Sequence, residues 1–244
     1  MKKLSTSELL EVWERGLSHP PSDWALMVLC TSCPEASWES HARMSIGRRD
    51  ARLLKLREQT FGPTMQGLCD CPRCGEQMEM SLDVADILLD GQAEAEEAQL
   101  LALHGFDVRY RLPNSLDLAA VAEIGDKAAA RKTLFQRCLV EVRSRDEDVH
   151  PDALPVSVTD AVEERIALAD AQADIQLNLT CPGCNHTWQT TFDIVTFFRQ
   201  ELNTWAHRLL QDVHTLAAAY GWSEDAILAL SSTRRQAYLE MVTG

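Results

Sequence analysis

Two short cysteine motifs, placed 110 residues apart, constrain this chain more than any other feature of its sequence. Each has the form Cys-Pro-x-Cys; the first spans residues 71–74 and the second spans 181–184. The residues that follow also match, since an aspartate stands nine residues after the second cysteine of each motif, at Asp83 and Asp193. We therefore interpret the two segments as an internal repeat.

The matched positions predict the same local structure in both copies. Gly75 and Asn185 directly follow the second cysteine, and both are residue types that tolerate a positive φ. Apolar residues alternate after them, as in a short strand. Asp83 and Asp193 then stand where they can cap a helix. Each copy is expected to form a strand, a tight turn, a return strand and a helix start.

Paired cysteines at this spacing are typical of structural zinc sites. A structural zinc ion takes four ligands in a tetrahedron, and each motif supplies two. The predicted site is therefore one Zn²⁺ ion held by four cysteines: Cys71, Cys74, Cys181 and Cys184. Four thiolates leave no open position for water or substrate, so the predicted role of this zinc is structural.

Two other interpretations of these cysteines stay open. In the first, each motif binds its own metal, with Cys69 or His186 as an additional ligand. In the second, the cysteines are reduced and metal-free. We favour the shared site because the two motifs match each other in context as well as in spacing.

The pair Cys30 and Cys33 has the same spacing but no repeat partner. It lies at the end of an apolar segment, so the simplest interpretation is two buried cysteines at a helix end. A thiol-redox enzyme that uses this pair is the alternative. The chain has no Gly-x-x-x-x-Gly-Lys, Gly-x-Ser-x-Gly or His-Glu-x-x-His motif, and we expect it not to be an enzyme.

The net charge of the chain limits the classes of partner that it can bind. The formal net charge is −14, with a local acidic excess at Glu94, Glu96 and Glu97, so we expect no nucleic-acid binding through bulk electrostatics. The sequence has no apolar run long enough for a membrane span. Its first eight residues do not resemble a signal peptide, which makes the cytoplasm the default compartment.

Hydrophobic periodicity predicts an α+β protein that is mostly α-helical, with a small zinc-ribbon-like β element formed by the two motifs. An N-terminal helical region is expected over residues 1–63. A two-motif core is expected over 64–192, with a helical insertion at about 90–172 that includes a helix from 126 to about 143. A long helix and a short helical tail are expected over 193–244.

Several segments resemble the phage T4-type baseplate hub assembly family. They are Leu10-x-x-Trp13-Glu14, the run Ser-Ile-Gly-Arg-Arg-Asp-Ala-Arg-Leu-Leu-Lys-Leu-Arg-Glu at 45–58, Phe61-Gly62, the Cys-Pro-x-Cys-Gly motif at 71–75 and the closing segment 220–239. Proteins similar to this one occur in contractile phage tails and in phage-tail-like contractile injection systems.

The resemblance implies a non-enzymatic structural protein or assembly chaperone whose partners are other baseplate or hub proteins. It implies a location in the bacterial cytoplasm during assembly, and it leaves open whether the protein stays in the finished particle. A zinc-ribbon adaptor in transcription or another complex is the rival reading. The negative charge and the lack of basic residues around the second motif count against it.

Basic residues gather at Arg48, Arg49 and Arg52, at the start of a predicted helix. Cations are unfavourable there, because the N-terminal end of the helix dipole is positive. We therefore expect these arginines to contact an acidic or polar partner surface. A solvated helix face is the plain alternative.

Overall fold

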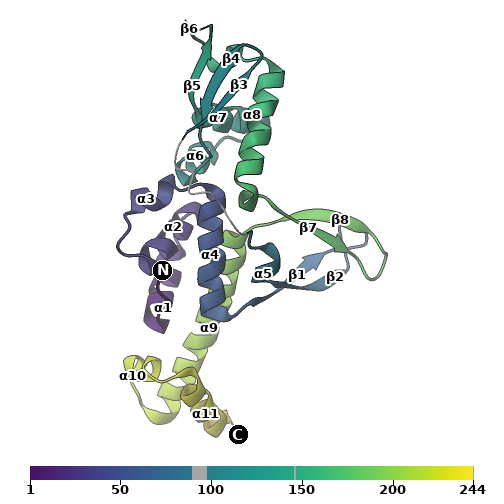
Figure 1. Cartoon of the computed structure of the whole chain (residues 1–244). Coiled ribbons are helices and arrows are strands. Elements are labelled where there is room, and N and C mark those ends of the chain that lie inside the picture. The colour runs from purple at the N-terminus through teal and green to yellow at the C-terminus, as the bar shows by residue number, and fades with distance from the viewer. Residues whose placement is uncertain (90–97, 146, 244) are drawn as a thin grey trace.

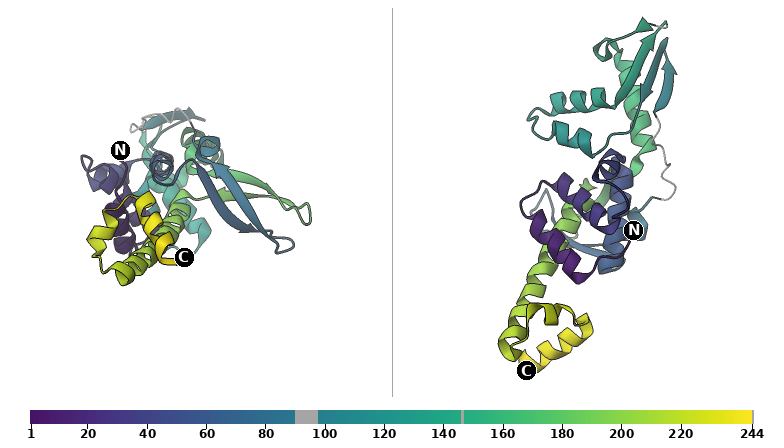
Figure 2. Two further views of the ribbon diagram at one scale, coloured as in Figure 1. Left: turned by 90° about the horizontal axis from the view of Figure 1, so that it is seen from below. Right: turned by 90° about the vertical axis from the view of Figure 1, so that its left-hand side faces the viewer.

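The computed structural model describes residues 1–89, 98–145 and 147–243, so the acidic residues at 94, 96 and 97 lie outside the described part. A central helical body carries three extensions, which point in different directions in Figures 1 and 2. We name them the lobe (residues 98–145 and 147–169), the arm (64–83 and 175–192) and the tail (224–243).

The body is built from helices at both ends of the chain: α1 (Thr6–Gly16), α2 (Pro21–Ser32), α3 (Trp38–Arg43), α4 (Ile46–Phe61) and α9 (Ile194–Tyr220). Apolar side chains spaced one helical turn apart bury one face of each long helix. Trp24, Leu53 and Phe198, from α2, α4 and α9, are at most 1 % exposed and form the centre of the core. Residues far apart in sequence therefore make one packed unit.

The arm consists of two antiparallel ribbons that lie side by side and extend from the body in the same direction (Figures 1 and 2). Their strands are β1 (Thr64–Asp70), β2 (Gln77–Asp83), β7 (Ile175–Thr180) and β8 (Thr187–Phe192). Alternate residues point to one face. Met65 and Leu177 lie on the inner face and join the core of the body, whereas the outer faces are mostly polar. The arm is thus continuous with the body at its base.

The lobe, within the described residues, holds a four-stranded antiparallel sheet in the order β3-β4-β5-β6. Between strands β2 and β7 the chain forms, in order, α5 (Val84–Ile87), β3 (Gln99–Leu103), β4 (Phe106–Tyr110), α6 (Ser115–Val121), α7 (Lys127–Cys138), β5 (Leu139–Ser144), β6 (Glu147–Asp148), the 3₁₀ turn η1 (Pro151–Ala153), α8 (Val156–Ala169) and the 3₁₀ turn η2 (Ala171–Ala173). Val108, Phe135 and Val162 form the separate core of the lobe, where α7 and α8 pack on one face of the sheet.

The prediction of a helical insertion is wrong in part. The sequence predicted a helix to about residue 143, but α7 ends at Cys138 and β5 begins at Leu139. Val140 and Val142 are β-branched and alternate with charged side chains, which favours a strand, and β5 pairs with β4. The boundaries of the three predicted regions remain a prediction.

The tail folds back on the distal end of α9 and forms a small cluster of its own (Figure 1). Its helices are α10 (Glu224–Leu228) and α11 (Ser232–Thr243). Gly221 ends α9 with a φ of 68°, and the rings of Tyr220, Trp222 and Tyr238 contact one another beyond it. No helix in the described part of the chain is long and apolar enough to cross a membrane.

Candidate metal centre

Four cysteine sulfurs meet at the end of the arm that lies away from the body (Figure 1). They belong to Cys71, Cys74, Cys181 and Cys184, and all four lie within 4.8 Å of one another. Cys71 Sγ is 3.7 Å from Cys184 Sγ, and Cys74 Sγ is 3.6 Å from Cys181 Sγ. The first cysteine of each motif is thus close to the second cysteine of the other, as a pseudo-twofold relationship requires.

The two turns that carry the cysteines have the same backbone structure. In the first turn, the N–H of Cys71 donates to the carbonyl of Glu76, and the N–H of Gly75 donates to the carbonyl of Cys71. The second turn repeats both bonds at the equivalent positions: Cys181 to His186, and Asn185 to Cys181. All four of these bonds measure 2.9 Å. Gly75 has a φ of 74° and Asn185 a φ of 54°, which confirms the predicted left-handed positions.

Backbone amides face the sulfurs and favour loss of the thiol protons. Burial raises the pKa of Cys71, but hydrogen bonds from the N–H groups of Cys74 and Arg73 outweigh it and lower this pKa to about 7. The N–H of Glu76 donates to the sulfur of Cys74 and lowers the pKa of this thiol. Hydrogen bonds from the thiol to neighbouring cysteine sulfurs have the larger combined effect, and the pKa of Cys74 is raised to about 12. Four thiolates this close repel one another, so all four lose their protons only when a cation is bound.

Glu76 also reaches this cluster, a contact that no sequence pattern indicates. Its Oε2 lies 3.9 Å from Cys181 Sγ, which donates to it. The Glu76 carboxylate covers Gly183, where a Cβ atom would overlap it. A side chain at this position would make the Glu76 carboxylate move. Cys69 and His186, the other ligands considered, are not in the cluster, and the ring of His186 stacks on that of Trp188.

The two aspartates that follow the motifs differ. Asp193 caps α9, with Oδ1 accepting the N–H of Val195 at 2.9 Å, as predicted. Asp83 precedes α5 but makes no side-chain cap, so that prediction is wrong. Instead its Oδ1 accepts from Thr64 Oγ1 at 2.8 Å, because Thr64 lies directly opposite it in the ribbon.

The three arginines of the predicted partner surface do not form one surface. Arg49 is 5 % exposed; its Nε donates to Asp50 at 2.7 Å and its guanidinium to Ser115 Oγ at 3.3 Å. Arg49 is therefore held inside the body by contacts within the chain. Arg48 and Arg52 are half-buried, and their partner role remains a prediction.

Cys30 and Cys33 lie at the end of α2, as expected, and Cys33 is buried. Burial raises the pKa of Cys30, and the nearby Cys33 raises it further. A thiol-redox pair needs the opposite shift, because the thiolate is the reactive form. Cys138, at the end of α7, is also buried, and burial raises its pKa to about 11.

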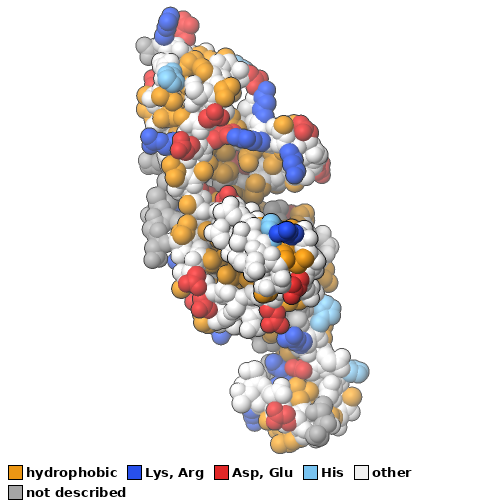
Figure 3. All heavy atoms as spheres, turned by 90° about the vertical axis from the view of Figure 1, so that its right-hand side faces the viewer, with side chains coloured by type: hydrophobic (Ala, Val, Ile, Leu, Met, Phe, Trp, Pro, Cys, Tyr) orange, Lys and Arg blue, Asp and Glu red, His pale blue; other side chains and the backbone are white. Residues whose placement is uncertain are grey.

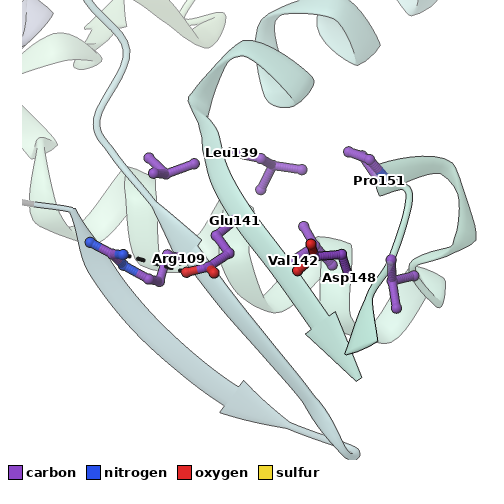
Figure 4. Close-up of a pocket in the computed structure, with 8 residues that line it drawn as sticks. Arg109, Leu139, Glu141, Val142, Asp148 and Pro151 are labelled. Carbon is purple, nitrogen blue, oxygen red and sulfur yellow. Dashed lines mark hydrogen bonds and ion pairs between the residues drawn. The ribbon is translucent and has the colours of Figure 1, made fainter. Parts of the chain in front are cut away.

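A pocket of about 430 Å³ lies beside strands β4 and β5 of the lobe (Figure 4). Glu141 lies directly opposite Arg109 on the neighbouring strand and pairs with it at 3.4 Å; it also pairs with Arg143 at 2.9 Å. The other lining residues are Leu139, Val140, Val142, Asp148, Val149 and Pro151. Within the described part of the chain, its lining carries no hydroxyl, thiol or imidazole group.

Fold and site together define a helical protein whose arm ends in a cluster of four cysteines able to hold a metal ion. Residues 25–199 match the family model described as T4 bacteriophage base plate protein, and the chain belongs to this family. This confirms the resemblance seen in the sequence. The match runs from α2 into α9, so it includes most of the body, the arm and the lobe, and ends before the tail. No curated protein and no solved structure matches the chain.

Proposed function

We propose that this protein is a non-enzymatic hub component or assembly chaperone of a contractile tail or contractile injection system, stabilised by one structural zinc ion. Its family supports a structural role in the phage baseplate. The observation that carries the zinc proposal is the meeting of four cysteine sulfurs from two matched motifs.

The spacing of the sulfurs fits zinc. A tetrahedral ion with Zn–S bonds of about 2.3 Å holds its sulfurs about 3.8 Å apart. The two cross-motif distances are 3.7 Å and 3.6 Å, and no pair exceeds 4.8 Å. Cys71, Cys74, Cys181 and Cys184 would hold the ion and fill all four positions. The zinc would thus fasten the ends of the two ribbons without taking part in chemistry.

Partners are proposed to be other baseplate or hub proteins. On the face shown in Figure 3, acidic and basic side chains are interspersed, and no continuous basic stripe crosses it. Together with a net charge of −14, this counts against a nucleic-acid adaptor. The raised pKa of Cys30 counts against a thiol-redox enzyme.

The metal content of the purified protein tests the zinc proposal. Cys71→Ser and Cys181→Ser are measured separately, with Cys69→Ser as the matched control, because Cys69 lies in β1 outside the cluster. One zinc per chain that is lost in both cluster variants and kept in the control is expected. Zinc lost in only one of them would mean separate sites, and a metal-free wild type would refute the proposal.

The baseplate role is tested in cells that produce the tail or injection system. Deletion of the gene is expected to abolish complete sheathed particles by electron microscopy, and expression from a plasmid is expected to restore them. An immunoblot of purified particles then separates a resident component from an assembly factor. Normal particles in the deletion strain would refute the role.

A further inference from the structure

A cavity of about 580 Å³ lies where α3 and the first turn of α4 meet the first turn of α6 and the last turn of α7. Volumes of about 300–1,000 Å³ are typical of ligand sites. Its lining is mostly polar and contains four arginines: Ser40, Arg43, Ser45, Arg48, Arg111, Leu112, Asn114, Leu116, Asp117 and Arg137. The cavity is thus a concentration of positive charge in a protein whose net charge is −14.

Among the residues that the structure describes, Asp117 is the single carboxylate in this lining, and two arginines bind it. It is fully buried, and Arg111 binds it through both terminal nitrogens, at 2.5 Å and 2.9 Å. Arg137 Nε donates to the same carboxylate at 2.9 Å. One carboxylate is therefore paired with two guanidinium groups, so this group of three side chains carries a net positive charge.

The remaining donors face the cavity from two sides. Arg137 is 41 % exposed and donates to Asp117 through Nε, which leaves its terminal nitrogens for another acceptor. Arg43, the last residue of α3, already binds Glu39 through Nε and one terminal nitrogen, so it offers its other terminal nitrogen but no unmatched charge. Guanidinium groups bind carboxylates through such paired donors, as Arg111 does here.

We propose that this cavity binds carboxylate side chains of an acidic segment of a partner protein. Leu112 and the half-exposed Leu116 add an apolar wall, which contacts the methylenes of a peptide but offers nothing to a small inorganic anion. A nucleic-acid backbone is recognised along an extended basic stripe, whereas these arginines gather at one cavity. Arg48, one of the arginines predicted from the sequence to contact a partner, also lines this cavity.

Binding of a fluorescein-labelled hexaglutamate peptide to the full-length protein tests this site, by anisotropy at low salt, where charge screening is weak. Hexaglutamine is the neutral comparison. Two variants change the cavity: the double variant Arg43→Gln, Arg137→Gln, and Ser40→Glu, which places a carboxylate on an exposed lining residue without disturbing the core. The matched controls are Arg131→Gln, on α7 outside the cavity, and Ser18→Glu, on the body.

Hexaglutamate is expected to bind and hexaglutamine to bind far more weakly. Each cavity variant is expected to weaken hexaglutamate binding by about tenfold or more, the change that follows loss of one charge-assisted hydrogen-bonded pair. The controls should stay close to wild type. Equal affinity for the two peptides, or unchanged affinity in the cavity variants, would overturn the proposal. Displacement of hexaglutamate by an equal concentration of inorganic phosphate would instead assign a small-anion site and overturn the protein partner. None of these outcomes depends on zinc or on the baseplate role.

Discussion

The carboxylate of Asp170 accepts the backbone N–H of Gly47 at 2.9 Å, although the two residues are 123 positions apart. Asp170 directly follows α8 and is 4 % exposed, and it also accepts from Ser45 Oγ at 2.9 Å. It therefore places a negative group at the positive N-terminal end of α4. Arg48, Arg49 and Arg52 put positive charge near the positive end of the helix dipole, and the carboxylate of Asp170 offsets this repulsion.

Gly47→Ala is expected to destabilise the protein, although alanine normally stabilises a helix by about 1 kcal/mol relative to glycine. A Cβ atom at this position would overlap the Asp170 carboxylate and crowd the backbone N of Ala173. Overpacking of this kind lowers the free energy of unfolding by about 1–3 kcal/mol. Urea unfolding measures it. The cost should shrink in an Asp170→Ala background, and a more stable Gly47→Ala single variant would contradict the packing.

Glu201→Ala is expected to lower the free energy of unfolding by about 3–5 kcal/mol, because it leaves the buried Arg57 charge without its partner. Arg57 is 1 % exposed and binds both oxygens of Glu201, at 2.8 Å and 2.5 Å. The control is Glu11→Ala, which breaks an exposed pair with Arg15 and should cost less than about 0.5 kcal/mol. Equal effects of the two changes in urea unfolding would contradict the role given to Arg57.

Asp50 makes stability depend on pH in a direction unusual for a carboxylate. Burial raises its pKa to about 6, despite the adjacent Arg49. The folded state therefore holds this proton more tightly than the unfolded state, and the stabilisation present below about pH 4 is lost as pH rises through 6. The loss amounts to about 3 kcal/mol. Wild type should thus be more stable relative to Asp50→Asn at pH 4 than at pH 7, by chemical denaturation. A difference that is the same at both pH values would refute the raised pKa.

Metal removal is expected to loosen the arm before the body. A chelator should increase amide hydrogen exchange in β1, β2, β7 and β8, because the bound metal would join the ends of these ribbons through the four cysteines. The core of α2, α4 and α9 lies apart from the cysteines and should keep its protection. Cys74→Ser should show the same exchange pattern with or without chelator. Faster exchange in α4 and α9 of wild type would show that the metal supports the whole fold.

The cysteine cluster was predictable because local rules determine it. The left-handed positions at Gly75 and Asn185 follow from residue type, and the shared site follows from ligand number. The lobe was less predictable. The alternation at 140–143 favours a strand, but this segment follows directly from a helix, and pairing with β4 decides where the helix ends. The burial of Arg49 depends on Ser115, 66 positions away, and no local pattern reports such a contact.

The two cysteine motifs of the arm are synthesised at different times. The first two cysteines are synthesised 110 residues before the second two, and three-quarters of the chain must exist before the cluster can be complete. At about 5–20 residues per second, translation of that interval takes roughly 5–20 s. During it, the first turn carries two thiols without their partners. The closing of the arm is therefore a late event in the life of each new chain, and it follows the synthesis of the entire lobe.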